Sequence, residues 1–148
     1  MVNNAPVLIA EDDSNDVFLL RRAFQKAGLT RPIVVVHNGQ EAVDYLARQD
    51  AKARRNEEHF PALLLLDLKM PLMDGFDVLS WMQSFPMSQK LPVIILTSSN
   101  QDKDIQQARS LGADEYRVKP QQFEDLVQIV KEVHERWLGP RLMAGDEQ

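Results

Sequence analysis

The chain has 148 residues, of which 44% are hydrophobic and 26% charged, the composition of one ordinary globular domain. Its formal net charge of −5 argues against nucleic acid as a direct partner, and the absence of cysteine excludes a disulfide framework, a thiolate nucleophile and a cysteine-based zinc site. The apolar runs are far shorter than the ~20 residues that cross a bilayer, and the first residues lack signal-peptide features, so we expect a cytoplasmic protein without a membrane span.

Short apolar runs alternate with amphipathic segments along the chain. The runs predict strands at residues 7–10, 33–37, 63–67, 92–96 and 114–118. The segments between them repeat apolar residues at helical spacing, most clearly from Phe123 to Trp137. We expect Ser14, Asn15 or Asp16 to cap the first helix, and the highly charged residues 48–59 to form a frayed helix end and a solvated loop.

This alternation predicts an α/β fold, a doubly wound five-stranded parallel sheet of the flavodoxin-like kind with five helices. Its crossovers are right-handed, and helices cover both faces of the sheet. No repeat, low-complexity tract or linker interrupts the pattern. We therefore expect one domain over residues 6–138, with tails at residues 1–5 and 139–148.

The segment Ala62–Phe76, ALLLLDLKMPLMDGF, carries the first sign of function. Its four leucines fit a strand buried on both faces, and Asp67 follows where that strand ends, before a turn that contains Asp74 and Gly75. Because ligands of open α/β sheets bind beyond the carboxyl ends of the strands, Asp67 is placed for chemistry. A capping or turn role would also explain a single aspartate, so the interpretation depends on what else converges there.

Polar groups end three further strands. They are Glu11-Asp12-Asp13 after the first strand, Thr97-Ser98 at the fourth and Lys119-Pro120 after the fifth. All these ends lie at one edge of a parallel sheet, so the groups converge on Asp67. Packed carboxylates repel one another unless a cation joins them, and oxygen ligands without histidine or cysteine suit Mg²⁺. The lysine indicates a bound anion and the threonine hydroxyl a hydrogen bond to it, which together indicate a phosphoryl-handling centre.

The order of these motifs is an acidic pair, then D-x-x-M-P-x-M-D-G, then Thr97, then Lys119-Pro120. It resembles the receiver domain of two-component response regulators, the CheY-like fold with strand order 2-1-3-4-5, and the resemblance covers residues 6–138. It implies that Asp67 accepts a phosphoryl group from the phosphohistidine of a sensor histidine kinase and loses it slowly by autodephosphorylation. The phosphorylated chain would then signal to a downstream protein or to the next step of a relay.

The resemblance also implies a role for each matching residue. Four groups would hold Mg²⁺: Glu11 through water, Asp12, Asp67 and the backbone carbonyl of Lys69. Lys119 would pair with a phosphoryl oxygen, aimed inward by a cis Lys119–Pro120 bond. Thr97 would move to hydrogen-bond the phosphoryl group, and Tyr116 would turn into the space that Thr97 leaves.

Two features depart from the common receiver pattern. Residues 48–59 lengthen the connection before the third strand, and Lys69 stands two residues after the acceptor. Lys69 either pairs with neighbouring acids or alters dephosphorylation, because this position borders the path of hydrolytic water in the family. With the extended last helix, these features are similar to those of small stand-alone regulators that serve bacterial phytochrome kinases.

Other functions fit the sequence less well. A magnesium-dependent phosphatase of the haloacid-dehalogenase type, which forms an aspartyl phosphate, needs a second aspartate where Lys69 stands. A flavin or nucleotide binder needs a glycine-rich loop after the first strand, where this chain has Glu11-Asp12-Asp13. The intact set of site residues argues against a pure interaction module. We also expect a homodimer through the fourth helix, fifth strand and fifth helix, with Trp137 at its surface.

Overall fold

The computed structural model describes residues 5–139, so the expected tails at residues 1–5 and 139–148 lie almost entirely outside the described residues. Within this range the chain forms one parallel sheet in the order β2-β1-β3-β4-β5, as predicted. The strands are β1 (Val7–Ala10), β2 (Ile33–Val36), β3 (Leu63–Leu66), β4 (Val93–Thr97) and β5 (Glu115–Val118). The helices are α1 (Ser14–Lys26), α2 (Gly39–Arg54), α3 (Gly75–Ser84), α4 (Asp102–Ser110) and α5 (Phe123–Leu138).

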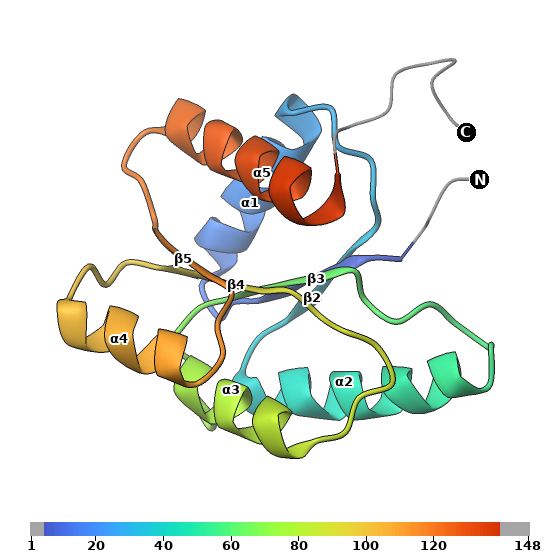
Figure 1. Ribbon diagram of the computed structural model, residues 1–148. Helices are drawn as coiled ribbons and strands as arrows, with labels where there is room; N and C mark the ends of the chain where they lie inside the picture. The colour runs from blue at the N-terminus through green and yellow to red at the C-terminus, as the bar shows by residue number, and fades with distance from the viewer. Residues whose placement is uncertain (1–4, 140–148) are drawn as a thin grey trace.

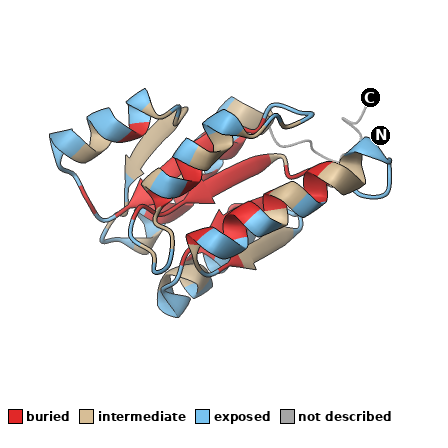
Figure 2. Cartoon of the chain, turned by 90° about the horizontal axis from the view of Figure 1, so that it is seen from below, coloured by how far each residue is buried: buried red, intermediate tan, exposed pale blue. Residues whose placement is uncertain are grey.

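Helices cover both faces of the sheet. Helices α1 and α5 pack together on one face, and α2, α3 and α4 lie on the other (Figure 1). Alternate side chains of each central strand enter opposite cores: in β1, Val7 and Ile9 pack under α1 and α5, whereas Leu8 and Ala10 face α2 and α3. Strands β1, β3 and β4 are buried along their whole length, as Figure 2 shows for the centre of the sheet. This explains why they read as continuous apolar runs.

None of the helices in the described range is long and apolar enough to cross a bilayer.

Helix α1 begins in a way that the sequence did not identify. Asp13 is its N-cap, and the Asp13 carboxylate accepts hydrogen bonds from the backbone N–H groups of Asn15 at 2.8 Å and Asp16 at 3.1 Å. The prediction of a cap at Ser14, Asn15 or Asp16 is therefore wrong. The reason is that the backbone is still extended at Asp13 and becomes helical at Ser14, directly after the acidic residues that end β1.

Helix α2 is longer than predicted, because residues 48–54 are regular helix rather than a frayed end. Asp50 is buried, and its carboxylate accepts from Arg54 Nε at 2.8 Å and from the backbone N–H and hydroxyl of Ser88, both at 2.7 Å. Burial alone would raise the pKa of Asp50, but the hydrogen bonds from Arg54 and Ser88 hold it below its ordinary value. Polar contacts thus fix this end of α2, which is why apolar periodicity gave no sign of it.

The connection from β3 to α3 passes very close to Asp67. The Gly75 N–H donates to the Leu68 carbonyl at 2.9 Å, and a Cβ on Gly75 would lie 2.5 Å from the Asp67 carbonyl oxygen. Asp74 caps α3 in a capping box with Asp77. The Asp-Gly pair of the motif therefore lets α3 begin directly against the segment that carries the acceptor candidate.

We predict that Gly75→Ala destabilises the fold by about 1–3 kcal/mol, because the added methyl group collides with backbone that cannot move without displacing Asp67. Urea unfolding followed by circular dichroism measures this. Ser80→Ala, an exposed position on the same helix, is the matched control and should change stability by about 0.5 kcal/mol or less. Equal stability of the two variants would contradict the prediction.

Candidate functional site

The predicted convergence of acidic groups is present at the carboxyl edge of the sheet. Glu11 and Asp67 directly follow the neighbouring strands β1 and β3, and both are buried, with exposures of 2% and 6%. Asp12 is exposed beside them. One carboxylate oxygen from each of the three residues lies within 4.8 Å of the other two. The strand ends thus gather a three-carboxylate cluster around Asp67.

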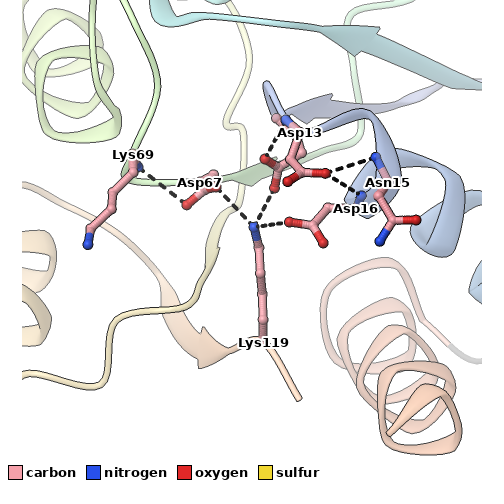
Figure 3. A network of polar contacts seen from close by, with 7 residues as sticks. Asp13, Asn15, Asp16, Asp67, Lys69 and Lys119 are labelled. Carbon is pink, nitrogen blue, oxygen red and sulfur yellow. Dashed lines mark hydrogen bonds and ion pairs between the residues drawn. The ribbon is translucent and has the colours of Figure 1, made fainter. Parts of the chain in front are cut away.

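The Lys119 side chain enters this cluster from the end of β5. Its Nζ lies 2.7 Å from Glu11 Oε1, 2.7 Å from Asp16 Oδ2 and 3.0 Å from Asp67 Oδ2 (Figure 3). The predicted cis Lys119–Pro120 bond is wrong, since none of the described peptide bonds is cis. The long lysine stem reaches all three carboxylates through a trans bond, so a cis bond is not needed to aim it.

The pKa values of Glu11 and Lys119 are shifted by burial and by the excess of carboxylates over ammonium groups in the site. Burial, together with the nearby charge of Asp67, raises the pKa of Glu11 to about 7 against the opposing hydrogen bond from Lys119. Burial alone would lower the pKa of Lys119, but hydrogen bonds to Asp16 and Glu11 and the charge of Asp67 outweigh it and raise that pKa. The lysine is therefore firmly charged, and the site keeps an excess of negative charge.

Thr97 lies on β4, the strand next to β3, and Tyr116 lies on β5, which pairs with β4. Thr97, the last residue of β4, is fully buried, and its hydroxyl has no hydrogen-bond partner within the described part of the chain. An unpartnered buried hydroxyl is unfavourable, and this one is free to donate to a group bound beside it. The Tyr116 hydroxyl donates to the Ser99 carbonyl at 2.9 Å, so β5 is tied to the loop that follows Thr97.

Lys69 takes part in the site through its backbone. Its N–H donates to Asp67 Oδ1 at 3.3 Å, and its exposed side chain points away from Asp67 (Figure 3). The alternative in which Lys69 pairs with neighbouring acids is wrong, because it forms no ion pair with any residue between 5 and 139. The Lys69 side chain is thus a free cation two residues from the acceptor candidate.

One residue of the site escaped the sequence analysis. Asp16, in the first turn of α1, contacts Lys119 as closely as Glu11 does. The sequence indicates only a helix cap at this position. The position of Asp16 in the sequence could have indicated this role. A helix that starts directly after an acidic strand end places its first turn over the same edge of the sheet.

Comparison with known families places the chain. Residues 7–131 match the response regulator receiver domain, so the chain belongs to this family, as the motifs predicted. Its sheet order and helices are those of the CheY-like, flavodoxin-like fold. Receiver domains work in two-component systems, and a histidine kinase is the partner that membership of this family implies.

Three relatives illustrate the match. The probable methanogenesis regulatory protein FilR2 of Methanothrix harundinacea is 37% identical over 133 residues, covering 90% of this chain and 83% of that protein. The phosphorylated cyanobacterial phytochrome response regulator RcpA is 31% identical with a TM-score of 0.79, covering 92% of this chain and 95% of that one. The Mn²⁺-bound response regulator Rcp1, from Synechocystis, is 25% identical with a TM-score of 0.77, covering 94% and 98%.

The donor set fits a divalent cation. Glu11, Asp12 and Asp67 offer only carboxylate oxygens, which are the ligands of hard divalent ions. Two of the three are buried, so the negative charge is not relieved by water. Lys119 compensates part of that charge and would repel a cation that binds beside it.

We predict that Lys119→Ala tightens Mn²⁺ binding roughly tenfold, because the substitution removes a positive charge next to the cluster. Asp12→Asn should weaken binding, since it removes one ligand charge without touching Lys119. Isothermal titration of the purified variants with MnCl₂ measures both. The prediction fails if Lys119→Ala binds Mn²⁺ no more tightly than the unmodified chain.

Proposed function

We propose that this receiver domain accepts a phosphoryl group on Asp67 from the phosphohistidine of a sensor histidine kinase, and that the modified chain signals by changing conformation. The observation that carries the proposal is the surroundings of Asp67. Its buried carboxylate stands at the sheet edge, 3.0 Å from a charged lysine and beside two further acids. The unpartnered hydroxyl of Thr97 ends the neighbouring strand.

The transfer follows from the groups around Asp67. A carboxylate oxygen of Asp67 forms a bond to phosphorus while the bond from phosphorus to the histidine nitrogen breaks, and the electron pair stays with the imidazole. Negative charge then develops on the equatorial phosphoryl oxygens. The Lys119 ammonium and the Lys69 N–H already face Asp67 and can donate to those oxygens.

The proposed metal ligands are Glu11 through water, Asp12, Asp67 and the Lys69 backbone carbonyl. Mg²⁺ held there would offset the negative charge of the phosphoryl group. The carboxylate cluster supports this assignment.

The proposed switch begins at Thr97. Its hydroxyl would donate to a phosphoryl oxygen and so draw the end of β4 toward Asp67. The loop that follows Thr97 is linked to β5 and α4: the Ser99 carbonyl accepts from Tyr116 on β5, and the Ser99 hydroxyl donates to Asp104 of α4 at 2.6 Å. A shift of this segment would release Tyr116 and move α4. The output is a change in the populations of two arrangements of α4 and β5.

We predict that acetyl phosphate with MgCl₂ adds one phosphoryl group to the chain, and that Asp67→Asn abolishes the addition because no nucleophile remains. Intact-mass spectrometry at short incubation times measures this. Asp44→Asn, an exposed aspartate on α2, is the matched control and should be phosphorylated like the unmodified chain. Phosphorylation of Asp67→Asn to the same extent would contradict the proposal.

The Lys69 side chain is proposed to slow hydrolysis of the acyl phosphate. The side chain points away from Asp67, but it is exposed and forms no ion pair with residues 5–139, so it is free to turn back and cover the approach of water to Asp67. We predict that Lys69→Asn shortens the half-life of the phosphorylated chain by about threefold or more, as expected for a modest loss of barrier height. Decay of the phosphorylated mass measures this, with Lys103→Asn on α4 as the control. An unchanged half-life would contradict the role.

We propose a phytochrome as the sensor kinase, because the solved relative RcpA is a phytochrome response regulator. The downstream partner is a protein or a further phosphorelay step. The rival function, a magnesium-dependent phosphatase that forms an aspartyl phosphate, would turn over phosphomonoesters. The second aspartate that such a phosphatase needs is absent, because Lys69 stands at that position.

A homodimer through α4, β5 and α5 is also proposed. Trp137 is already engaged within the chain, since its Nε1 donates to Glu115 at 2.7 Å, so the contact would involve the exposed parts of this face. We predict that the apparent mass rises with concentration and with phosphorylation. Analytical ultracentrifugation measures it, and a monomer at every concentration, with and without acetyl phosphate and MgCl₂, would rule the dimer out.

A further inference from the structure

The Lys119 ammonium uses all of its hydrogen-bond capacity. It has three N–H donors, and three carboxylates lie within hydrogen-bond distance: Glu11, Asp16 and Asp67. Glu11 and Asp67 belong to the cluster that fits a cation, but Asp16 does not. The Asp16 side chain therefore contacts the site through Lys119 alone.

Asp16 is itself held in place. The Asp13 carboxylate caps α1 and accepts from the Asp16 N–H at 3.1 Å, and the Asp13 N–H donates to Glu11 Oε2 at 3.0 Å. Lys119 connects Glu11 and Asp16 directly, since its ammonium donates to Glu11 Oε1 and to Asp16 Oδ2. The result is a closed ring of hydrogen bonds through Glu11, Asp13, Asp16 and Lys119, part of which is visible in Figure 3.

The ring restricts where the lysine can point. Two N–H groups are fixed by Glu11 and Asp16 at 2.7 Å each, so the third is directed at Asp67, where the contact is longer at 3.0 Å. A free lysine side chain loses rotamer freedom when it binds an anion, whereas a lysine already held by two carboxylates loses little. The ring therefore orders the side chain in advance.

We propose that Asp16 is a positioning residue for phosphoryl transfer: together with Glu11 it fixes the Lys119 ammonium so that one N–H stays aimed at Asp67 and at the phosphoryl group that forms there. This inference rests on the proposed function of Asp67. When the group is attached, a phosphoryl oxygen takes the place of the Asp67 oxygen on the third N–H, and the bonds to Glu11 and Asp16 are kept. Asp16 contacts neither substrate nor proposed metal, so it acts only through the lysine.

The test compares Asp16→Ala and Asp16→Asn with the matched control Asp125→Asn. Asp125 also occupies the first turn of a helix, α5, so its substitution removes the same favourable interaction with a helix N-terminus but touches no site residue.

The initial rate of phosphorylation is measured at increasing concentrations of acetyl phosphate in saturating MgCl₂. The curve gives the maximal rate constant and the half-saturation concentration, and the ratio of the first to the second is compared between variants. We expect this ratio to fall about three- to tenfold for Asp16→Ala, the size of one charge-assisted hydrogen bond in a partly exposed site. Asp16→Asn keeps an acceptor oxygen and should lose less.

A double-mutant cycle with Lys119→Ala separates positioning from a general effect on the fold. If Asp16 acts through the lysine, Asp16→Ala has no further effect on the ratio once Lys119 is absent. Thermal unfolding of each variant accounts for any loss of stability. A full additive loss in the Lys119→Ala background would overturn the proposal.

A second readout needs neither metal nor phosphodonor. In the metal-free chain labelled with ¹⁵N-lysine, a fixed ammonium exchanges its protons slowly, so the Lys119 signal should be visible by NMR and should broaden or vanish in Asp16→Ala but not in Asp125→Asn. An unchanged Lys119 signal, or an unchanged or higher phosphorylation ratio in Asp16→Ala, would overturn the role of Asp16. Failure of the unmodified chain to become phosphorylated on Asp67 would instead overturn the proposed function.

Discussion

The structure depends on one electrostatic constraint: a carboxylate is buried at the end of a central strand, and a single ammonium compensates it. Asp67 is buried, and it directly follows β3, which is paired with β1 on one side and β4 on the other. The Asp67 carboxylate therefore cannot move into water. A buried charge is tolerated only when it is paired. Lys119 supplies that pairing from the end of β5, and the remaining negative charge makes the same place attractive to a cation.

The general architecture of the fold is enough to bring these charged residues together. Parallel strands bring all their carboxyl ends to one edge, and the crossover helices leave that edge open. The two cores on either side of the sheet fix the central strands, so the residues that follow them inherit defined positions. The loop after β4 is hydrogen-bonded to both α4 and β5, and the proposed switch would act through these contacts.

The sequence allowed the fold and most of the site to be predicted because both depend on strong, local signals. Buried strands appear as apolar runs, and the residue type that ends each run is unambiguous. What it did not reveal depends on contacts between distant segments. The hydrogen bonds from Ser88 to the Asp50 carboxylate stabilise the end of α2, where the apolar periodicity stops. Nothing near Asp50 in the sequence indicates that Ser88 is its partner.

The same limit applies around Lys119. Asp16 lies 103 positions away from it, so the sequence showed a plausible helix cap rather than a partner of the lysine. The expectation of a cis bond before Pro120 came from resemblance, and this chain reaches its carboxylates through a trans bond. Residue types at strand ends are thus predictable, whereas the particular hydrogen-bond partner of a long side chain is not.

The central claim is that Asp67 is the position that becomes an acyl phosphate. Borohydride reduces an aspartyl phosphate to homoserine, so the treated chain can be digested and the modified residue located by peptide mass spectrometry. After incubation with acetyl phosphate and MgCl₂, we expect homoserine at position 67 and at no other aspartate. Homoserine at Asp12 or Asp16, or none at position 67, would contradict the account.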